Sequence, residues 1–207
     1  MEDYKYIAVE GNIGAGKTSL CKLLAKRYNA DLLLEEFEEN SFLKGFYQDK
    51  ARYAFSLELS FLADRFHQVS KSINENLVIA DYHIAKTIAF ASHTLNSDEF
   101  ELFRKLYDIM IEQLPKVDLL IYLQRDTDTL LKNIKLRGRE YEKSIDTAYL
   151  EAVENSYQEL LPELNVPRVL HIDCSDLDFV NDAAHFRKLM MVIESGEHQA
   201  YSRHKIC

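Results

Sequence analysis

Residues 10–19, Glu-Gly-Asn-Ile-Gly-Ala-Gly-Lys-Thr-Ser (EGNIGAGKTS), directly follow the apolar run Tyr6–Val9. From Gly11 to Thr18 the segment matches the pattern G-x-x-x-x-G-K-[ST] in full, and a helical pattern follows at 17–28. Glycines let consecutive backbone N–H groups converge on phosphate oxygens, and the start of the next helix adds its positive dipole end. The stretch therefore predicts a strand, a phosphate-binding loop and a helix.

We expect this loop to bind ATP together with Mg²⁺, with Lys17 reaching the β- and γ-phosphates and the Thr18 hydroxyl helping to hold the metal. Asp81 follows the apolar run Leu77–Ala80 and is the expected second support of Mg²⁺, although an Asp in this place can also cap the next helix. The predicted nucleotide-binding residues of the loop are Gly11, Asn12, Ile13, Gly14, Ala15, Gly16, Lys17, Thr18 and Ser19.

Short apolar runs recur along the chain, at 6–9, 32–34, 77–80, 119–123 and 169–172. Continuous runs of this kind are typical of strands buried on both faces of a parallel sheet. Helical periodicity lies between and after them, at 17–28, 52–75, 98–114, 146–161 and 177–193. This alternation predicts an α/β fold, a doubly wound parallel sheet of about five strands flanked by helices.

Two helix starts carry capping signals. Asp98 and Glu101 have the spacing of a capping box, and Asp126 or Thr127 can cap a helix that Gly138 ends. No linker rich in Pro, Gly or Ser divides the chain. We therefore expect a single domain over 1–207, with a loose tail at about 195–207.

Composition excludes several classes of protein. The formal net charge of −9 argues against a nucleic-acid partner. Three cysteines, widely spaced and without a C-x-x-C pair, argue against a disulfide framework or a zinc site and fit a reducing cytoplasm. The start of the chain has no signal-peptide pattern, and no apolar run is long enough for a membrane span. We expect a cytoplasmic protein without a membrane partner.

The acceptor of the phosphate has to be sought outside the loop. GTP-dependent switch proteins read guanine with an N-K-x-D motif after a late strand, and this sequence has no such motif there. Of the P-loop proteins considered, a compact kinase for a small molecule therefore fits best. Its expected base is Glu35, directly after the second apolar run, with Glu36, Glu38 and Glu39 as rivals. The basic residues Lys132, Lys135, Arg137 and Arg139 form an expected cationic cover, although they could simply complement a helix dipole.

These pieces occur in the order seen in deoxynucleoside kinases. The loop, the strand-two Glu, the segment from Phe46 to Arg65, the Asp81 strand end and the run Arg137-Gly138-Arg139-Glu140-Tyr141-Glu142 carry the resemblance. Over residues 4–193 the chain resembles the bacterial deoxyadenosine/deoxyguanosine branch, which implies a P-loop kinase fold, a nucleoside substrate and a homodimer.

The resemblance also implies roles for individual residues. Glu35 would accept the 5′-hydroxyl proton, and Tyr47 and Glu142 would hold the 3′-hydroxyl. Arg65 would lie near the nucleobase and the 5′ end of the bound nucleoside. Arg137 and Arg139 would act with Lys17 to stabilise charge on the phosphates, in a lid over about 137–145.

The chain departs from the family pattern at two positions. Asp81-Tyr82-His83 lacks the Arg that usually follows the acidic residue, and Lys86 or His83 is the candidate to replace it. Glu58 stands where many relatives place a base-reading Gln. An ionised Glu58 only accepts hydrogen bonds, which favours a purine, deoxyadenosine first, and disfavours thymidine. Alternatively, Glu58 pairs with Arg65, seven positions on along the same helix.

Two other functions remain open at this point. One is a nucleoside monophosphate kinase of thymidylate-kinase type, although the acidic turn at 35–39 disfavours a second phosphate. The other is a non-catalytic nucleotide switch. Glu10, just before the loop, is expected to be a strand-end residue without a catalytic role.

Overall fold

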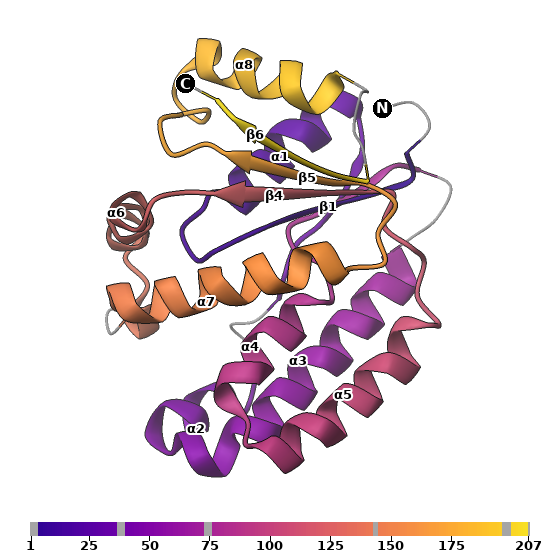
Figure 1. The fold of residues 1–207 in the computed structure, drawn as a ribbon, viewed down its shortest axis with the longest axis vertical. Helices are drawn as coiled ribbons and strands as arrows, with labels where there is room; N and C mark the ends of the chain where they lie inside the picture. Colours follow the sequence, from indigo (N-terminus) through magenta and orange to yellow (C-terminus); the bar gives the residue numbers. More distant parts are fainter. Residues whose placement is uncertain (1–3, 37–39, 73–75, 143–144, 196–199, 207) are drawn as a thin grey trace.

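The computed structural model describes residues 4–36, 40–72, 76–142, 145–195 and 200–206. Its centre is a six-stranded sheet in the order β2-β3-β1-β4-β5-β6, and all five strand pairings are parallel (Figure 1). The strands are β1 (Tyr6–Gly11), β2 (Asp31–Leu33), β3 (Val78–Ala80), β4 (Leu119–Gln124), β5 (Val169–Asp173) and β6 (Tyr201–Lys205). This confirms the predicted parallel α/β sheet, with one more strand than expected.

The sixth strand corrects the expectation of a loose tail. Residues 201–205 pair with β5 in register, Tyr201 opposite Val169 and Lys205 opposite Asp173. The sequence Tyr-Ser-Arg-His-Lys carries no apolar run because β6 lies at the edge of the sheet and its side chains are exposed or only half-buried. The tail residues 196–199 and 207 lie outside the described residues.

Helices connect the strands. They are α1 (Lys17–Tyr28), α2 (Leu43–Gln48), α3 (Lys50–Ser72), α4 (Lys86–Thr94), α5 (Ser97–Ile111), α6 (Thr127–Arg137), α7 (Thr147–Leu160) and α8 (Ala183–Glu194), with short 3₁₀ turns at η1 (Glu140–Glu142) and η2 (Leu161–Glu163). The sequence did not predict α2 and α4. Both are short, and α4 has no clear apolar stripe because it is buried on several sides, at Thr87, Ile88, Ala89 and Ala91.

The capping signals gave one correct and one wrong prediction. Helix α6 begins as expected, because the Asp126 side chain accepts a hydrogen bond from the Thr129 N–H, and it ends at Gly138 with φ 70°. The capping box of α5, however, is formed by Asn96 and Glu99, two residues before the predicted pair. Glu101 instead forms an ion pair with Lys105 one turn along the helix.

The sheet separates two hydrophobic cores. Alternate residues of β1 enter them, Tyr6 and Ala8 on one face and Ile7 and Val9 on the other. Helices α3, α4 and α5, which pack side by side in Figure 1, cover the first face together with α7, whereas α1, α6 and α8 cover the second. The loops after the strands therefore meet at the carboxyl edge of the sheet. In the part of the chain that the structure describes, no helix has the length and apolar character needed to cross a membrane.

Candidate active site

A continuous cavity of about 1690 Å³ lies at the carboxyl edge of the sheet. It runs from the phosphate loop to the helices α2, α3 and α4, and its volume exceeds that of a pocket for one small ligand. Of the predicted site residues, those that line it are Ile13, Gly14, Gly16, Lys17, Thr18, Ser19, Glu35, Tyr47, Glu58, Arg65, Asp81, Arg137, Arg139 and Glu142. The cavity thus has room for a phosphate donor and an acceptor at once.

The phosphate loop has the conformation that the glycine pattern predicts. Gly14 has φ 83°, and a Cβ atom there would lie 2.7 Å from the backbone oxygen of Leu130, so only glycine fits. Gly11, Asn12 and Ala15 are buried behind the cavity wall. The Asn12 side chain donates to the Leu150 carbonyl at 2.8 Å and so ties the loop to α7. This anchoring role of Asn12 was not visible in the motif.

Lys17 lies at the centre of the loop. Its Nζ donates to the carbonyl oxygens of Gly11 at 2.8 Å and Asn12 at 3.0 Å. Burial lowers the pKa of the Lys17 ammonium to about 8, and the nearby charge of Lys86 acts in the same direction, whereas Glu10, Glu35 and Asp81 oppose it. The ammonium is therefore held in a half-buried position beside the loop carbonyls.

Thr18 and Asp81, the two predicted metal ligands, are in contact. The Thr18 hydroxyl donates to Asp81 Oδ2 at 2.5 Å, while Asp81 Oδ1 accepts from the Glu35 N–H at 2.7 Å. A hydroxyl and a carboxylate beside a phosphate loop are the hard oxygen ligands that Mg²⁺ takes. Within the described ranges no group of three or more His, Cys, Asp or Glu residues could form a metal cage. The residues present fit an Mg²⁺ that is held mainly by phosphate oxygens and water.

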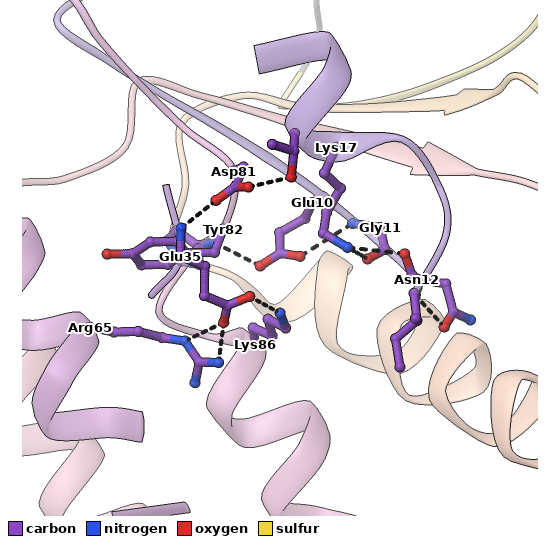
Figure 2. Close-up of polar contacts among 12 residues, drawn as sticks. Glu10, Gly11, Asn12, Lys17, Glu35, Arg65, Asp81, Tyr82 and Lys86 are labelled. Atoms are coloured by element: carbon purple, nitrogen blue, oxygen red, sulfur yellow. Dashed lines mark hydrogen bonds and ion pairs between the residues drawn. The ribbon is translucent and has the colours of Figure 1, made fainter. Parts of the chain in front are cut away.

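Glu35 projects into the cavity between two cations (Figure 2). Lys86 Nζ lies 2.5 Å from Glu35 Oε2, and Arg65 donates to Oε1 through Nε at 3.0 Å and through Nη2. Burial alone would raise the pKa of Glu35, but the charges and hydrogen bonds of Lys86 and Arg65 outweigh it and hold that pKa far below its usual range. Glu36 is exposed and does not line the cavity, and Glu38 and Glu39 lie outside the described residues.

Lys86 is a site residue that the sequence only suggested. It is the first residue of α4 and reaches the cavity beside Lys17. His83, the other candidate to replace the missing Arg, has a structural place: its backbone N–H donates to Glu10 at 2.7 Å, its Nδ1 accepts from Ala85, and burial lowers its pKa to about 4. The signal that could have identified Lys86 is a lysine at the start of the helix that follows the Asp81 strand.

Glu10 is buried behind the cavity, with 1% of its surface exposed. It accepts hydrogen bonds from the Gly11 N–H at 3.2 Å, the His83 N–H at 2.7 Å and the Tyr157 hydroxyl at 3.0 Å. Burial raises the pKa of Glu10, while the charges of Lys86 and Lys17 lower it. Glu10 therefore joins the phosphate loop, the end of β3 and α7 from beneath, as Figure 2 shows in part.

Glu58 lies deeper, between α3 and α4, and is 4% exposed. Its Oε1 accepts from the Thr94 hydroxyl at 2.9 Å. The alternative, a pairing of Glu58 with Arg65, is not formed, because the Arg65 guanidinium bonds Glu35 instead. Burial raises the pKa of Glu58 to about 7, against the hydrogen bond from Thr94 and the charges of Arg65 and Lys86. The predicted base preference rests on an ionised Glu58, and this raised pKa favours the neutral carboxyl group below about pH 7.

The predicted sugar-binding pair and the lid arginines form one group. Glu142, buried in η1, bonds Arg137 through Nη2 at 2.5 Å and Nε at 3.1 Å, and Arg139 Nη1 lies 3.6 Å away. Tyr47 on α2 faces the same place, since burial and then the charge of Glu142 raise its pKa. The two arginines are thus oriented by the carboxylate itself. Residues 143–144 of the predicted lid lie outside the described residues.

Arg125, directly after β4, was not predicted as a site residue. Its Nε donates to the Ala15 carbonyl at 2.9 Å, its Nη1 donates to the Cys174 carbonyl at 2.9 Å, and its guanidinium lies over the Phe179 ring, 5.1 Å from the centroid. It therefore connects the phosphate loop to the segment at 175–181, which lines the same end of the cavity. A basic residue at the carboxyl end of a central strand was the available signal.

Comparison with known proteins agrees with this geometry. The family model described as deoxynucleoside kinase matches residues 7–196. The chain is 37% identical to a deoxyguanosine kinase of Bacillus subtilis, covering 91% of this chain and 96% of that protein. It is 30% identical to a deoxyadenosine/deoxycytidine kinase of the same organism, covering 93% of each.

A solved structure, a deoxyadenosine kinase from M. mycoides with bound dATP, has the same fold, with a TM-score of 0.77 at 24% identity over 91% of this chain and 98% of that one. The family match and the curated relatives together settle the assignment: this chain is a member of the deoxynucleoside kinase family, a phosphotransferase with the P-loop kinase fold.

Proposed function

We propose that this kinase transfers the γ-phosphoryl group of ATP, bound with Mg²⁺, to the 5′-hydroxyl of a purine deoxyribonucleoside. The product is the 5′-monophosphate, and the reaction serves nucleoside salvage in the cytoplasm. The observation that carries the proposal is the position of Glu35, a carboxylate between Lys86 and Arg65 in a cavity continuous with the phosphate loop. Among curated relatives, a deoxyguanosine kinase and deoxyadenosine kinases support a purine.

At the donor end, the residues of the loop bind and neutralise the phosphates. Backbone N–H groups at the start of α1 point to the same place as its dipole, and Lys17 contributes an ammonium. Thr18 and Asp81 would hold Mg²⁺, which supplies further neutralisation of the phosphate oxygens. Arg137 and Arg139 would cover the transferring group from the opposite side.

At the acceptor end, Glu35 orients the 5′-hydroxyl and takes its proton. The bond from the 5′-oxygen to the γ-phosphorus forms as the bond from the γ-phosphorus to the bridging oxygen of ADP breaks. In the loose transition state of phosphoryl transfer the nucleophile needs little deprotonation in advance. The low pKa of Glu35 is therefore compatible with this role: the carboxylate stays ionised, positions the hydroxyl and receives the proton late.

The sugar would be held by Tyr47 and Glu142, a phenol and a carboxylate that face the same part of the cavity. Membership of the deoxynucleoside kinase family favours a nucleoside over a nucleoside monophosphate. We further propose a homodimer, which the exposed apolar residues Leu102 and Ile109 on α5 support.

The test is an assay of ATP consumption with nucleosides and nucleoside monophosphates as acceptors. Purine deoxynucleosides should be turned over, thymidine poorly, and monophosphates not at all. Glu35→Gln should lower kcat by roughly 10²- to 10⁴-fold, while calorimetry should still detect nucleoside binding. Glu36→Gln, at the exposed neighbouring position, should keep its activity. Full turnover by Glu35→Gln would mean that another residue is the general base.

A further inference from the structure

The acceptor end of the cavity contains a buried hydrogen-bond donor with no partner. Arg65 is 6% exposed, its Nε and Nη2 bond Glu35, and its Nη1 has no hydrogen-bond partner in the described part of the chain. Figure 2 shows this third nitrogen on the side of the guanidinium away from Glu35. Because an unpaired buried N–H is unfavourable and Arg65 lines the cavity, its Nη1 is placed to donate to an acceptor atom of a bound ligand.

Glu58 is the complementary group. It lies on α3 seven positions, or two turns, before Arg65, so the two residues share one face of the helix, and both line the cavity. The charge of Arg65 lowers the pKa of Glu58 against the effect of burial, so the two groups are within electrostatic reach of each other. The Thr94 hydroxyl bonds Oε1, and Glu58 lines the cavity. An ionised Glu58 can accept further hydrogen bonds and donates none. The pair therefore presents one donor beside two acceptor oxygens.

We infer, on the basis of the proposed function, that this end of the cavity is complementary to guanine and that the preferred acceptor is deoxyguanosine rather than deoxyadenosine. The O6 atom of guanine accepts from Arg65 Nη1, and N1–H and N2–H₂ donate to the carboxylate of Glu58. Adenine can donate only its N6 amino group there, and its N1 lone pair faces a carboxylate oxygen. Thymine places a carbonyl on each side of its single N–H, so it fits worst.

The protonation state of Glu58 should change this preference. A neutral Glu58 both donates and accepts, which matches N1 and N6–H₂ of adenine. The groups that face it are Arg65 on its own helix, Lys86 and Thr94 on α4, and Tyr149 on α7. Thr94 permits both states, because its single hydroxyl proton can go to Glu58 or to the Phe90 carbonyl at 3.1 Å. Because burial raises the pKa of Glu58 to about 7, the change between its ionised and neutral forms falls within a pH range in which the enzyme can be assayed.

The experiment measures kcat/KM for deoxyguanosine, deoxyinosine and deoxyadenosine at about pH 8 and about pH 6. At the higher pH, deoxyguanosine should exceed deoxyadenosine by at least about tenfold. Deoxyinosine, which lacks the 2-amino group, should fall about tenfold to a hundredfold below deoxyguanosine, the loss expected for one hydrogen bond to a charged group. The ratio of deoxyguanosine to deoxyadenosine should decrease at the lower pH.

Two variants separate Glu58 from other titrating groups. An amide donates and accepts at either pH, so Glu58→Gln should give a lower ratio that no longer changes with pH. His93 is an exposed imidazole at the cavity, and His93→Gln should keep the pH dependence. Deoxyadenosine used as well as deoxyguanosine at about pH 8, or deoxyinosine equal to deoxyguanosine, overturns the inference. Failure of every deoxynucleoside as an acceptor would overturn the proposed function instead.

Discussion

Replacing Glu58 with Gln should stabilise the folded protein at alkaline pH and much less at about pH 5. The carboxyl group is buried, and burial raises its pKa from an ordinary value of 4.5 to about 7. Glu58 therefore binds a proton more tightly in the folded than in the unfolded state. Its contribution to stability is complete below about pH 4.5 and is lost as the pH rises through about 7.

The size of the effect follows from the shift in pKa. One pKa unit corresponds to about 1.4 kcal/mol, so the full shift of Glu58 is worth about 3 kcal/mol. A glutamine at the same position does not titrate, so this loss does not occur in the variant. The difference in the free energy of unfolding, variant minus wild type, should thus grow by about 2 to 3 kcal/mol between about pH 5 and about pH 8.5.

Urea unfolding followed by circular dichroism at several pH values measures this difference directly. Taking the difference between two proteins cancels the contributions of all other titrating groups. Glu112→Gln, at the exposed end of α5, makes the same change of charge at the surface and serves as the control, with a difference that should not grow. A difference for Glu58→Gln that stays constant from about pH 5 to about pH 8.5 would refute the reasoning.

Two further predictions concern Lys86, one of the two cations that bind Glu35, and the proposed homodimer. Lys86→Met should lower kcat by about tenfold to a hundredfold with little change in KM for ATP, because it removes a charge-assisted hydrogen bond to Glu35. In steady-state kinetics, Lys86→Arg should recover most of the lost kcat. The control variant Lys105→Met, on the exposed face of α5, should behave as wild type. A change in KM alone for Lys86→Met would contradict the role of Lys86 in positioning Glu35. Light scattering should give twice the mass of one chain, and a monomer would contradict the proposed dimer.

The donor half of the site could be predicted residue by residue because it is local in sequence. Its conformation depends on the glycines of one continuous loop and on the start of α1, and these are adjacent along the chain. Even there, the part played by Asn12 escaped prediction, since its partner Leu150 is distant in the sequence. Local patterns therefore identified the loop but not its anchor.

The acceptor half was predicted less completely because it is built from distant segments. Glu35 meets Lys86 from the start of α4, and Arg65 turns toward Glu35 rather than toward Glu58 on its own helix. Helical spacing places Glu58 and Arg65 on the same face of α3 but two turns apart, and the Glu35 carboxylate just after β2 binds the guanidinium instead. The sequence did not predict β6 for a different reason, because a strand at the edge of a sheet is partly exposed and needs no apolar run.

The charges around the cavity alternate in a way that distinguishes its two ends. Lys17, Glu10, Lys86, Glu35 and Arg65 interact in sequence, each with neighbours of opposite sign. Lys17 bonds only neutral carbonyls among the described residues, and a phosphate oxygen is a stronger partner for an ammonium than a carbonyl. Lys86 and Arg65, in contrast, share the largely buried carboxylate of Glu35, and separating either pair leaves a poorly compensated charge. Lys17 can therefore transfer to the donor phosphates at little cost, whereas the acceptor cations stay with Glu35. In the proposed reaction, the acceptor hydroxyl would therefore meet a carboxylate whose position is already fixed, and selection of the nucleobase would fall to the remaining nitrogen of Arg65 and to Glu58.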